Sequence, residues 1–175
     1  MKKFTFIFGG VRSGKSNYSV KIAKSTAKNV VFIATASASD DEMKKRIDAH
    51  KKLRPVHWTL IEEGIDIDLA IKKIEIETDL VLIDCLGLFV TNLLMKKKSD
   101  SVIMKKINAI CSVIKEANFN VIIVSNDVGS GLVPDNYLAR RFRDLLGLAN
   151  QVMAKNADKV IFMQVGIPIV IKKEQ

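Results

Sequence analysis

An octapeptide near the amino terminus carries residue types that bind phosphate groups. It reads Gly-Gly-Val-Arg-Ser-Gly-Lys-Ser and matches the pattern G-x-x-x-x-G-K-[ST]. Its glycines allow successive backbone N–H groups to converge on phosphate oxygens, and a helix starting at its end would add partial positive charge. We predict that Lys15 contacts the β- and γ-phosphates of ATP or GTP and that the Ser16 hydroxyl binds Mg²⁺. The predicted nucleotide-binding residues of this loop are Gly9, Gly10, Val11, Arg12, Ser13, Gly14, Lys15 and Ser16.

A carboxylate is also needed beside such a metal ion, and two aspartates follow apolar strands. Asp84 ends the run 80–83, as the aspartate of a Walker B strand does. Asp127 follows the run 121–124 and is the weaker candidate. An aspartate that merely caps a strand is nearly as common. It is the pairing with the phosphate loop that favours Asp84 as a ligand of the metal or the nucleotide.

A histidine outside this loop, His50, offers a second kind of chemistry. It shares one side of a predicted helix over residues 40–53 with apolar residues, and this pattern alone favours a half-buried core histidine. The alternative is a nucleophile, because a neutral imidazole can attack the α-phosphorus of a nucleotide and form a phosphoramidate. Arg46, Lys51 and Arg54 would then offset the growing phosphate charge. The spacing by itself leaves both interpretations open.

The elements that position these residues alternate between short apolar runs and longer amphipathic stretches, which indicates an α/β fold. The predicted strands are 4–8, 30–34, 58–61, 80–83, 121–124, 160–165 and 167–171. The predicted helices are 16–27, 40–53, 66–77, 88–97, 101–117 and 137–157. Because the central strands are continuously apolar, we predict a mostly parallel sheet covered by helices on both faces. The last two strands should form an antiparallel pair, and residues 1–175 are expected to form one catalytic domain.

Composition limits the classes of protein that are compatible with the sequence. No run approaches the roughly 20 apolar residues that span a bilayer, and the two cysteines form no C-x-x-C pair. We therefore expect a cytoplasmic protein with reduced thiols, no structural zinc and no membrane span. The net charge of +9 suits nucleic acid or anionic small molecules. The lysines are dispersed and aromatic residues make up only 6%, so we expect no nucleic-acid partner.

Together these segments resemble one family, the bifunctional adenosylcobinamide kinase / adenosylcobinamide-phosphate guanylyltransferases of cobalamin biosynthesis. The resemblance runs from Phe6 to about Lys172. Phosphate loops are common, but the pattern R-I-x-x-H followed by R-P-x-x-W over residues 46–58 is much more specific. So is the loop V-G-x-G-x-V-P at residues 128–134. The resemblance implies a RecA-like P-loop fold, often assembled as a homotrimer with sites near subunit boundaries.

The resemblance also implies two reactions. ATP or GTP phosphorylates the aminopropanol hydroxyl of adenosylcobinamide, with Mg²⁺. GTP then guanylylates a histidine, and the GMP passes to the new phosphate to give adenosylcobinamide-GDP. By position this histidine is His50, which raises it from a core residue to a nucleophile. The nucleotide contacts implied outside the phosphate loop are Ala34, Thr35, Ala36, Lys51, Lys52, Leu53, Arg54, Glu62 and Asp84.

Two positions depart from the family pattern. Asp127 stands where the family usually has Glu, and Gly87 stands where Thr is common. Two other functions stay open at this point. A monofunctional P-loop kinase with a structural His50 would phosphorylate its substrate without a covalent GMP adduct. A RecA-like nucleic-acid-binding ATPase would show DNA- or RNA-stimulated hydrolysis and an affinity that falls steeply with salt.

Overall fold

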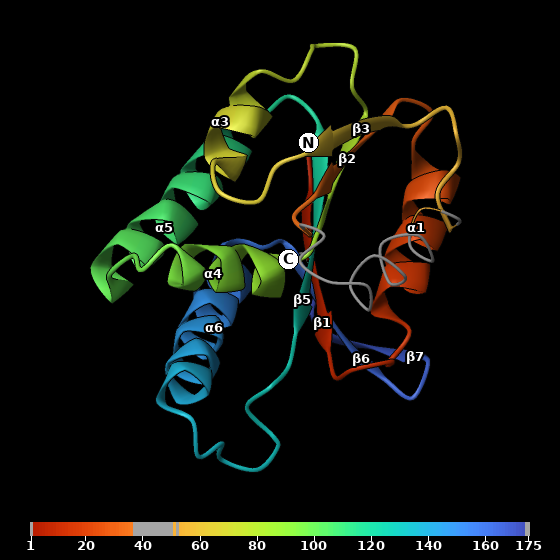
Figure 1. Cartoon of the computed structure of the whole chain (residues 1–175). Helices are drawn as coiled ribbons and strands as arrows, with labels where there is room; N and C mark the ends of the chain where they lie inside the picture. The colour runs from red at the N-terminus through yellow and green to blue at the C-terminus, as the bar shows by residue number, and fades with distance from the viewer. Residues whose placement is uncertain (1, 37–50, 52, 174–175) are drawn as a thin grey trace.

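The computed structural model describes residues 2–36, 51 and 53–173, and within them seven strands form one sheet (Figure 1). The sheet order is β3-β2-β4-β5-β1-β6-β7. Neighbouring strands are parallel except for the antiparallel pair of β6 and β7. The predicted α/β fold with a terminal antiparallel pair is therefore confirmed. The strands are β1 (Phe4–Gly9), β2 (Val30–Ala34), β3 (Thr59–Glu62), β4 (Leu80–Asp84), β5 (Asn120–Asn126), β6 (Lys159–Gln164) and β7 (Ile167–Lys172).

Helices cover both faces of this sheet (Figure 1). Helix α1 (Lys15–Thr26) packs on one face. The opposite face carries α3 (Ile67–Lys72), α4 (Leu86–Met95), α5 (Asp100–Glu116) and α6 (Tyr137–Asn156). In the described part of the chain, no helix is both long and apolar enough to cross a membrane.

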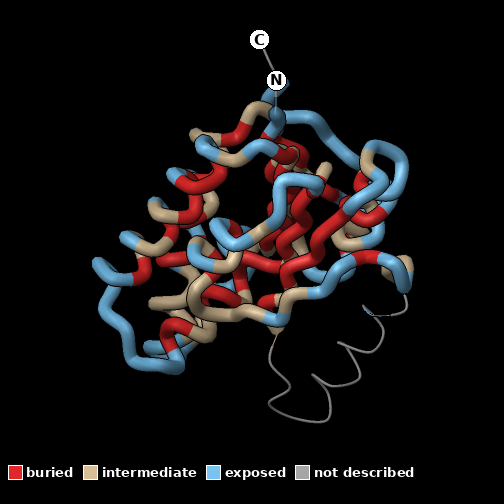
Figure 2. Tube along the Cα trace, turned by 90° about the horizontal axis from the view of Figure 1, so that it is seen from above, coloured by how far each residue is buried: buried red, intermediate tan, exposed pale blue. Residues whose placement is uncertain are grey.

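The alternation of side chains along the strands divides the core into two clusters. In β1, Phe4 and Phe6 belong to the cluster that includes residues of α3 to α6, whereas Ile7 belongs to the cluster under α1. The buried residues are concentrated in the strands at the centre of the molecule (Figure 2). Burial on both faces explains why the central strands read as continuous apolar runs in the sequence.

Helix α3 is shorter than predicted: it ends at Lys72, not near residue 77. The N–H groups of Lys73 and Ile74 each bond three residues back, which tightens and ends the helix. The chain then turns into β4, where the Asp79 carboxylate accepts the N–H groups of Lys28 and Asn29 at 3.0 and 2.8 Å. The prediction was wrong because the helical spacing of apolar residues continues to Ile74. In the structure this residue belongs to the connection that leads from α3 back to the sheet.

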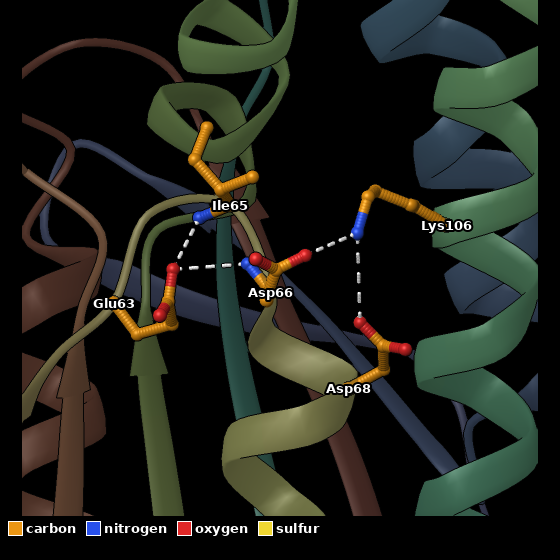
Figure 3. Close-up of polar contacts among 5 residues, drawn as sticks. All are labelled: Glu63, Ile65, Asp66, Asp68 and Lys106. Atoms are coloured by element: carbon orange, nitrogen blue, oxygen red, sulfur yellow. Dashed lines mark hydrogen bonds and ion pairs between the residues drawn. The ribbon is translucent and has the colours of Figure 1, made fainter.

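The connection from β3 to α3 is fixed by side chains (Figure 3). One carboxylate oxygen of Glu63 accepts the N–H groups of Ile65 and Asp66 at 2.7 and 2.9 Å. From α5, the Lys106 ammonium lies 2.6 Å from Asp66 and 3.9 Å from Asp68. These contacts hold the chain immediately after the last residue of β3, which borders the cavity described next.

Candidate nucleotide-binding site

A cavity of about 560 Å³ opens at the carboxyl ends of four adjacent strands, β2, β4, β5 and β1. The strands end in register, with Ala34 beside Asp84 and Gly9 beside Asn126. Ligands of open α/β sheets bind at this edge, because the connecting loops there leave a crevice. Most of the predicted site residues border this single space. They are Val11, Arg12, Ser13, Gly14, Lys15, Ser16, Ala34, Ala36, Lys51, Leu53, Arg54, Glu62 and Asp84.

The phosphate loop connects β1 to α1 and presents the amino end of that helix to the cavity. Gly14 caps the helix with a φ of 90°, a left-handed conformation that suits glycine. The Lys15 ammonium donates a hydrogen bond to the carbonyl oxygen of Gly10 at 2.8 Å. Burial lowers the pKa of Lys15, and the nearby Cys85 and Asp84 oppose this shift. The loop therefore combines free helix N–H groups with a partly desolvated ammonium, an arrangement that binds phosphate.

The turn between β6 and β7 supports this loop from the side. Val165 and Gly166 have φ values of 47° and 84°, as in a two-residue hairpin turn, and the Gly166 N–H donates to the Ser13 carbonyl at 3.1 Å. A Cβ on Gly9 would overlap the Met163 carbonyl oxygen, so the first glycine of the loop is required by packing against β6. The hairpin was predicted from the sequence, but its contact with the loop was not.

Arg54 adds a further positive charge to the cavity lining. The Arg54 guanidinium lies 4.1 Å from the centre of the Phe32 ring. Burial lowers the pKa of Arg54, opposed by the carboxylates of Asp84 and Glu62. Arg54 Nη1 and Ser13 Oγ are buried without a hydrogen-bond partner among the described residues. Buried polar atoms are normally paired, so these two atoms lack a partner that the described part of the chain supplies.

The donors that would hold Mg²⁺ also border the cavity. Ser16 supplies a hydroxyl and Asp84 a carboxylate. The described residues contain no group of three or more His, Cys, Asp or Glu side chains that would hold a metal by themselves. Mg²⁺ is usually bound through one or two carboxylates together with substrate phosphates and water, so this sparse donor set fits it.

Comparison with known proteins extends the assignment from the loop to the whole chain. Residues 5–171 match the family described as cobinamide kinase / cobinamide phosphate guanyltransferase. The chain belongs to this family. It is 35% identical over 168 residues to the bifunctional adenosylcobalamin biosynthesis protein CobP of Pseudomonas aeruginosa, covering 96% of each chain. It is also 35% identical over 178 residues to the bifunctional adenosylcobalamin biosynthesis protein CobU of Salmonella typhimurium, covering 95% of this chain and 98% of that protein.

The fold is also found outside the family. A crystal structure of the RadB recombinase superposes with a TM-score of 0.53 at 12% identity, covering 91% of this chain and 73% of that one. At this identity the likeness concerns the fold alone. It agrees with the RecA-like P-loop fold that the sequence predicted.

Five predicted site residues do not line the cavity. Three of them lie near it, and two lie outside the described residues. Gly9 and Gly10 form the start of the loop, and Thr35 has its side chain buried behind the wall. His50 and Lys52 lie outside the described residues.

Sequence reasoning missed five residues that border the cavity. They are Asn17, Phe32, Cys85, Leu88 and Asn126. The period of two along a strand places Phe32 on the same face as Ala34, and Cys85 directly follows Asp84. Asn126 is the last residue of a parallel strand next to the phosphate loop. Strand alternation and strand ends were thus the signals that could have identified several of them.

The two departures from the family pattern lie beside the cavity. Asp127 folds back on its own loop: its carboxylate accepts the Gly129 N–H at 3.0 Å and the Ser130 hydroxyl at 2.9 Å. A Cβ added to Gly87 would lie 3.4 Å from the side-chain nitrogen of Asn126. Residue 87 is therefore adjacent to a polar group on the cavity wall.

Proposed function

We propose that this family member phosphorylates the aminopropanol hydroxyl of adenosylcobinamide and then transfers GMP from GTP to the new phosphate, giving adenosylcobinamide-GDP. The observation that carries the proposal is the convergence of the phosphate loop, Lys15, Asp84 and Arg54 on one cavity. The family's description names both activities, a kinase and a guanylyltransferase. One phosphate-binding cavity can serve both reactions because each starts from a nucleoside triphosphate.

In the kinase reaction, the protein acts by positioning and by neutralising charge. The N–H groups at the start of α1 and the Lys15 ammonium hold the β- and γ-phosphates. Ser16 and Asp84 would hold Mg²⁺, which shields the phosphate oxygens when it is bound. The acceptor hydroxyl attacks the γ-phosphorus, the bond to the β-phosphate oxygen breaks, and the hydroxyl proton leaves.

The same two aspartates that follow strands, Asp84 and Asp127, are the candidates for receiving that proton. Both oxygens of Asp127 are engaged by Gly129 and Ser130 of its own loop, and Asp127 is not on the cavity wall. Asp84 borders the cavity beside Lys15. The geometry therefore favours Asp84 as the carboxylate that faces the reacting groups, with Asp127 shaping the neighbouring loop.

In the guanylyl reaction, His50 is the proposed nucleophile. Its ring nitrogen attacks the α-phosphorus, a P–N bond forms, and pyrophosphate leaves. The phosphate of the cobinamide intermediate then attacks, and the P–N bond breaks. His50 lies outside the described residues, but the next residue, Lys51, borders the cavity. Lys51 and Arg54 can offset the phosphate charge.

A cysteine, Cys85, also borders the cavity, but its thiol is a poor nucleophile. Burial, together with the adjacent Asp84, raises the pKa of the Cys85 thiol to about 12. The thiolate is the reactive form of cysteine, so Cys85 stays protonated and unreactive at neutral pH. This supports the imidazole of His50 as the group that carries GMP.

Incubation with GTP labelled at the α-phosphate tests the proposal. The wild-type chain with Mg²⁺ should retain one acid-labile, base-stable label per chain, as expected for a phosphoramidate. The His50→Asn variant should lose the label and still phosphorylate cobinamide from ATP. Phosphorylation by the wild-type chain without any label would instead support the monofunctional kinase, and label retained by His50→Asn would refute the assignment of the nucleophile.

We propose that both ATP and GTP serve as substrates, because the phosphate loop would hold the triphosphate that the two nucleotides share. From the family resemblance we propose a homotrimer in the cytoplasm, and from the dispersed lysines no nucleic-acid partner. Light scattering in solution measures the assembly. Nucleotide hydrolysis assays with and without DNA or RNA test the absence of a nucleic-acid partner. Stimulation by either polymer would contradict it.

A further inference from the structure

A single buried hydroxyl, that of Thr35, joins the ends of two strands behind the cavity. It accepts the Cys85 N–H at 2.7 Å and donates to the Cys85 carbonyl at 2.8 Å. The main-chain N–H of Thr35 donates to the Asp84 carbonyl at 3.2 Å. Thr35 is only 1% exposed, so its hydroxyl is occupied by the protein backbone and does not face the cavity.

The register of the sheet explains this contact. Ala34 of β2 pairs with Asp84 of β4, so the next residues along each chain, Thr35 and Cys85, leave the sheet side by side. At this point β4 ends and α4 begins, and Cys85 caps the helix without a side-chain hydrogen bond. Thr35 supplies from the neighbouring strand the acceptor that the Cys85 N–H needs. The backbone that carries Asp84 is held by the strand ladders up to Asp84 and by Thr35 at the next residue, Cys85.

A second link extends the network to the wall formed by β3. The Asn92 side chain, on α4, donates to the carbonyl oxygens of Thr35 and Gly64 at 2.9 and 3.1 Å. A Cβ on Gly64 would overlap the Asn92 nitrogen, so the close approach requires glycine there. Gly64 lies two residues after Glu62, which borders the cavity. Asn92 thus fixes the β3 end of the cavity relative to the β2 and β4 ends.

We infer that Thr35 is a positioning residue that acts through the Cys85 backbone to hold Asp84 in the orientation needed for Mg²⁺ and nucleotide. This inference rests on the proposed nucleotide site and changes the role expected for Thr35 from a side-chain contact to a buried support. Groups that orient metal ligands affect affinity or activity by about 10- to 100-fold when removed. A support that only stabilises the fold would not change how strongly Mg²⁺ promotes nucleotide binding.

The test measures binding of a non-hydrolysable GTP analogue by calorimetry, with Mg²⁺ and with a chelator. The ratio of the two affinities is the Mg²⁺ enhancement. Thr35→Val removes the hydroxyl at nearly constant volume, and we expect the enhancement to fall about 10-fold while binding without Mg²⁺ changes little. Thr35→Ser keeps the hydroxyl and should restore the enhancement. Thr78→Val is the matched control, because Thr78 is also buried but lies before β4, at the opposite end of the strand from Asp84.

The outcomes separate the two proposals. Wild-type chain without any Mg²⁺-promoted binding would overturn the proposed site and this inference together. Normal wild-type binding, with Thr35→Val matching Thr78→Val in Mg²⁺ enhancement, would overturn the inference alone. If Thr35→Val does not fold, Thr35→Ala removes the same hydroxyl without adding a methyl group at its position, and the same loss of enhancement is expected.

Discussion

The side-chain nitrogen of Lys15 lies 2.8 Å from the main-chain carbonyl oxygen of Gly10, five residues earlier in the same loop. The contact bends the lysine back over the loop, so its ammonium stays in the cavity beside Asp84 instead of extending into water. Burial weakens its hydration and thereby lowers its pKa. A cation that is partly desolvated before the ligand arrives interacts more strongly with phosphate.

Lys15→Ala should therefore weaken both reactions. Removing one preorganised donor from a reacting oxyanion typically lowers kcat by about 100-fold or more, and we expect such a loss for phosphorylation and for guanylylation. Steady-state rates of phosphorylation and of guanylylation measure this loss. Lys105→Ala, on the exposed side of α5, is the control for loss of one positive charge and should match the wild type. Near-normal rates for Lys15→Ala would contradict the role given to the loop.

The two aspartates that follow strands should differ in their importance for the kinase reaction. Asp84→Asn removes the carboxylate on the cavity wall, and we expect the phosphorylation rate to fall about 100-fold or more. Asp127→Asn keeps an oxygen for the Gly129 N–H and should reduce the rate only a few-fold. Comparable losses in the two variants would show that Asp127 also reaches the reacting groups.

Alanine substitutions at two glycines, Gly64 and Gly147, test the packing between β3 and α4. Gly64→Ala places a methyl group against the Asn92 side chain and 3.0 Å from the Thr35 carbonyl oxygen, so we expect a loss of about 1–3 kcal/mol in the free energy of unfolding. Gly147→Ala is the matched change in open space on α6 and should raise that free energy by about 0.5–1 kcal/mol through helix propensity. Denaturant titration measures both. A stable Gly64→Ala variant would mean that the close approach is not required.

Acid should selectively weaken the contact between Asp79 and the start of β2. Hydrogen bonds from the Asn29 and Lys28 N–H groups hold the pKa of Asp79 below its ordinary value of 3.8. Since the folded-state pKa is lowered, the stabilisation is fully present above the unfolded value and is lost as pH falls through the folded value. Asp79→Asn should therefore lower Tm at neutral pH, and its difference from wild type should shrink below about pH 4. Asp144→Asn, an exposed aspartate on α6, should show no such trend in melting curves.

The sequence predicted the residues of this site that belong to a fixed local pattern. The phosphate loop was identifiable because its glycines, lysine and serine occur together between a strand and a helix, and Asp84 because it ends an apolar run. The strand bounds were close for the same reason: burial on both faces leaves a continuous apolar signature.

What the sequence did not reveal depends on contacts between distant segments. The role of Thr35 could not be read from its neighbours, because its hydroxyl bonds with Cys85, 50 residues away. The contact of Asp79 with Asn29 joins residues 50 apart in the chain, and the support of the loop by Gly166 depends on the position of β6 in the sheet. Periodicity describes one segment at a time, so it carries no information on these pairings.

The most direct measurement is a crystal structure of the chain with Mg²⁺ and a non-hydrolysable GTP analogue. The account predicts the β- and γ-phosphates on the N–H groups at the start of α1, within hydrogen-bonding distance of Lys15, with the metal between the phosphates and Ser16 and Asp84. Density for the triphosphate at another site, with the phosphate loop unchanged and unbound, would contradict it.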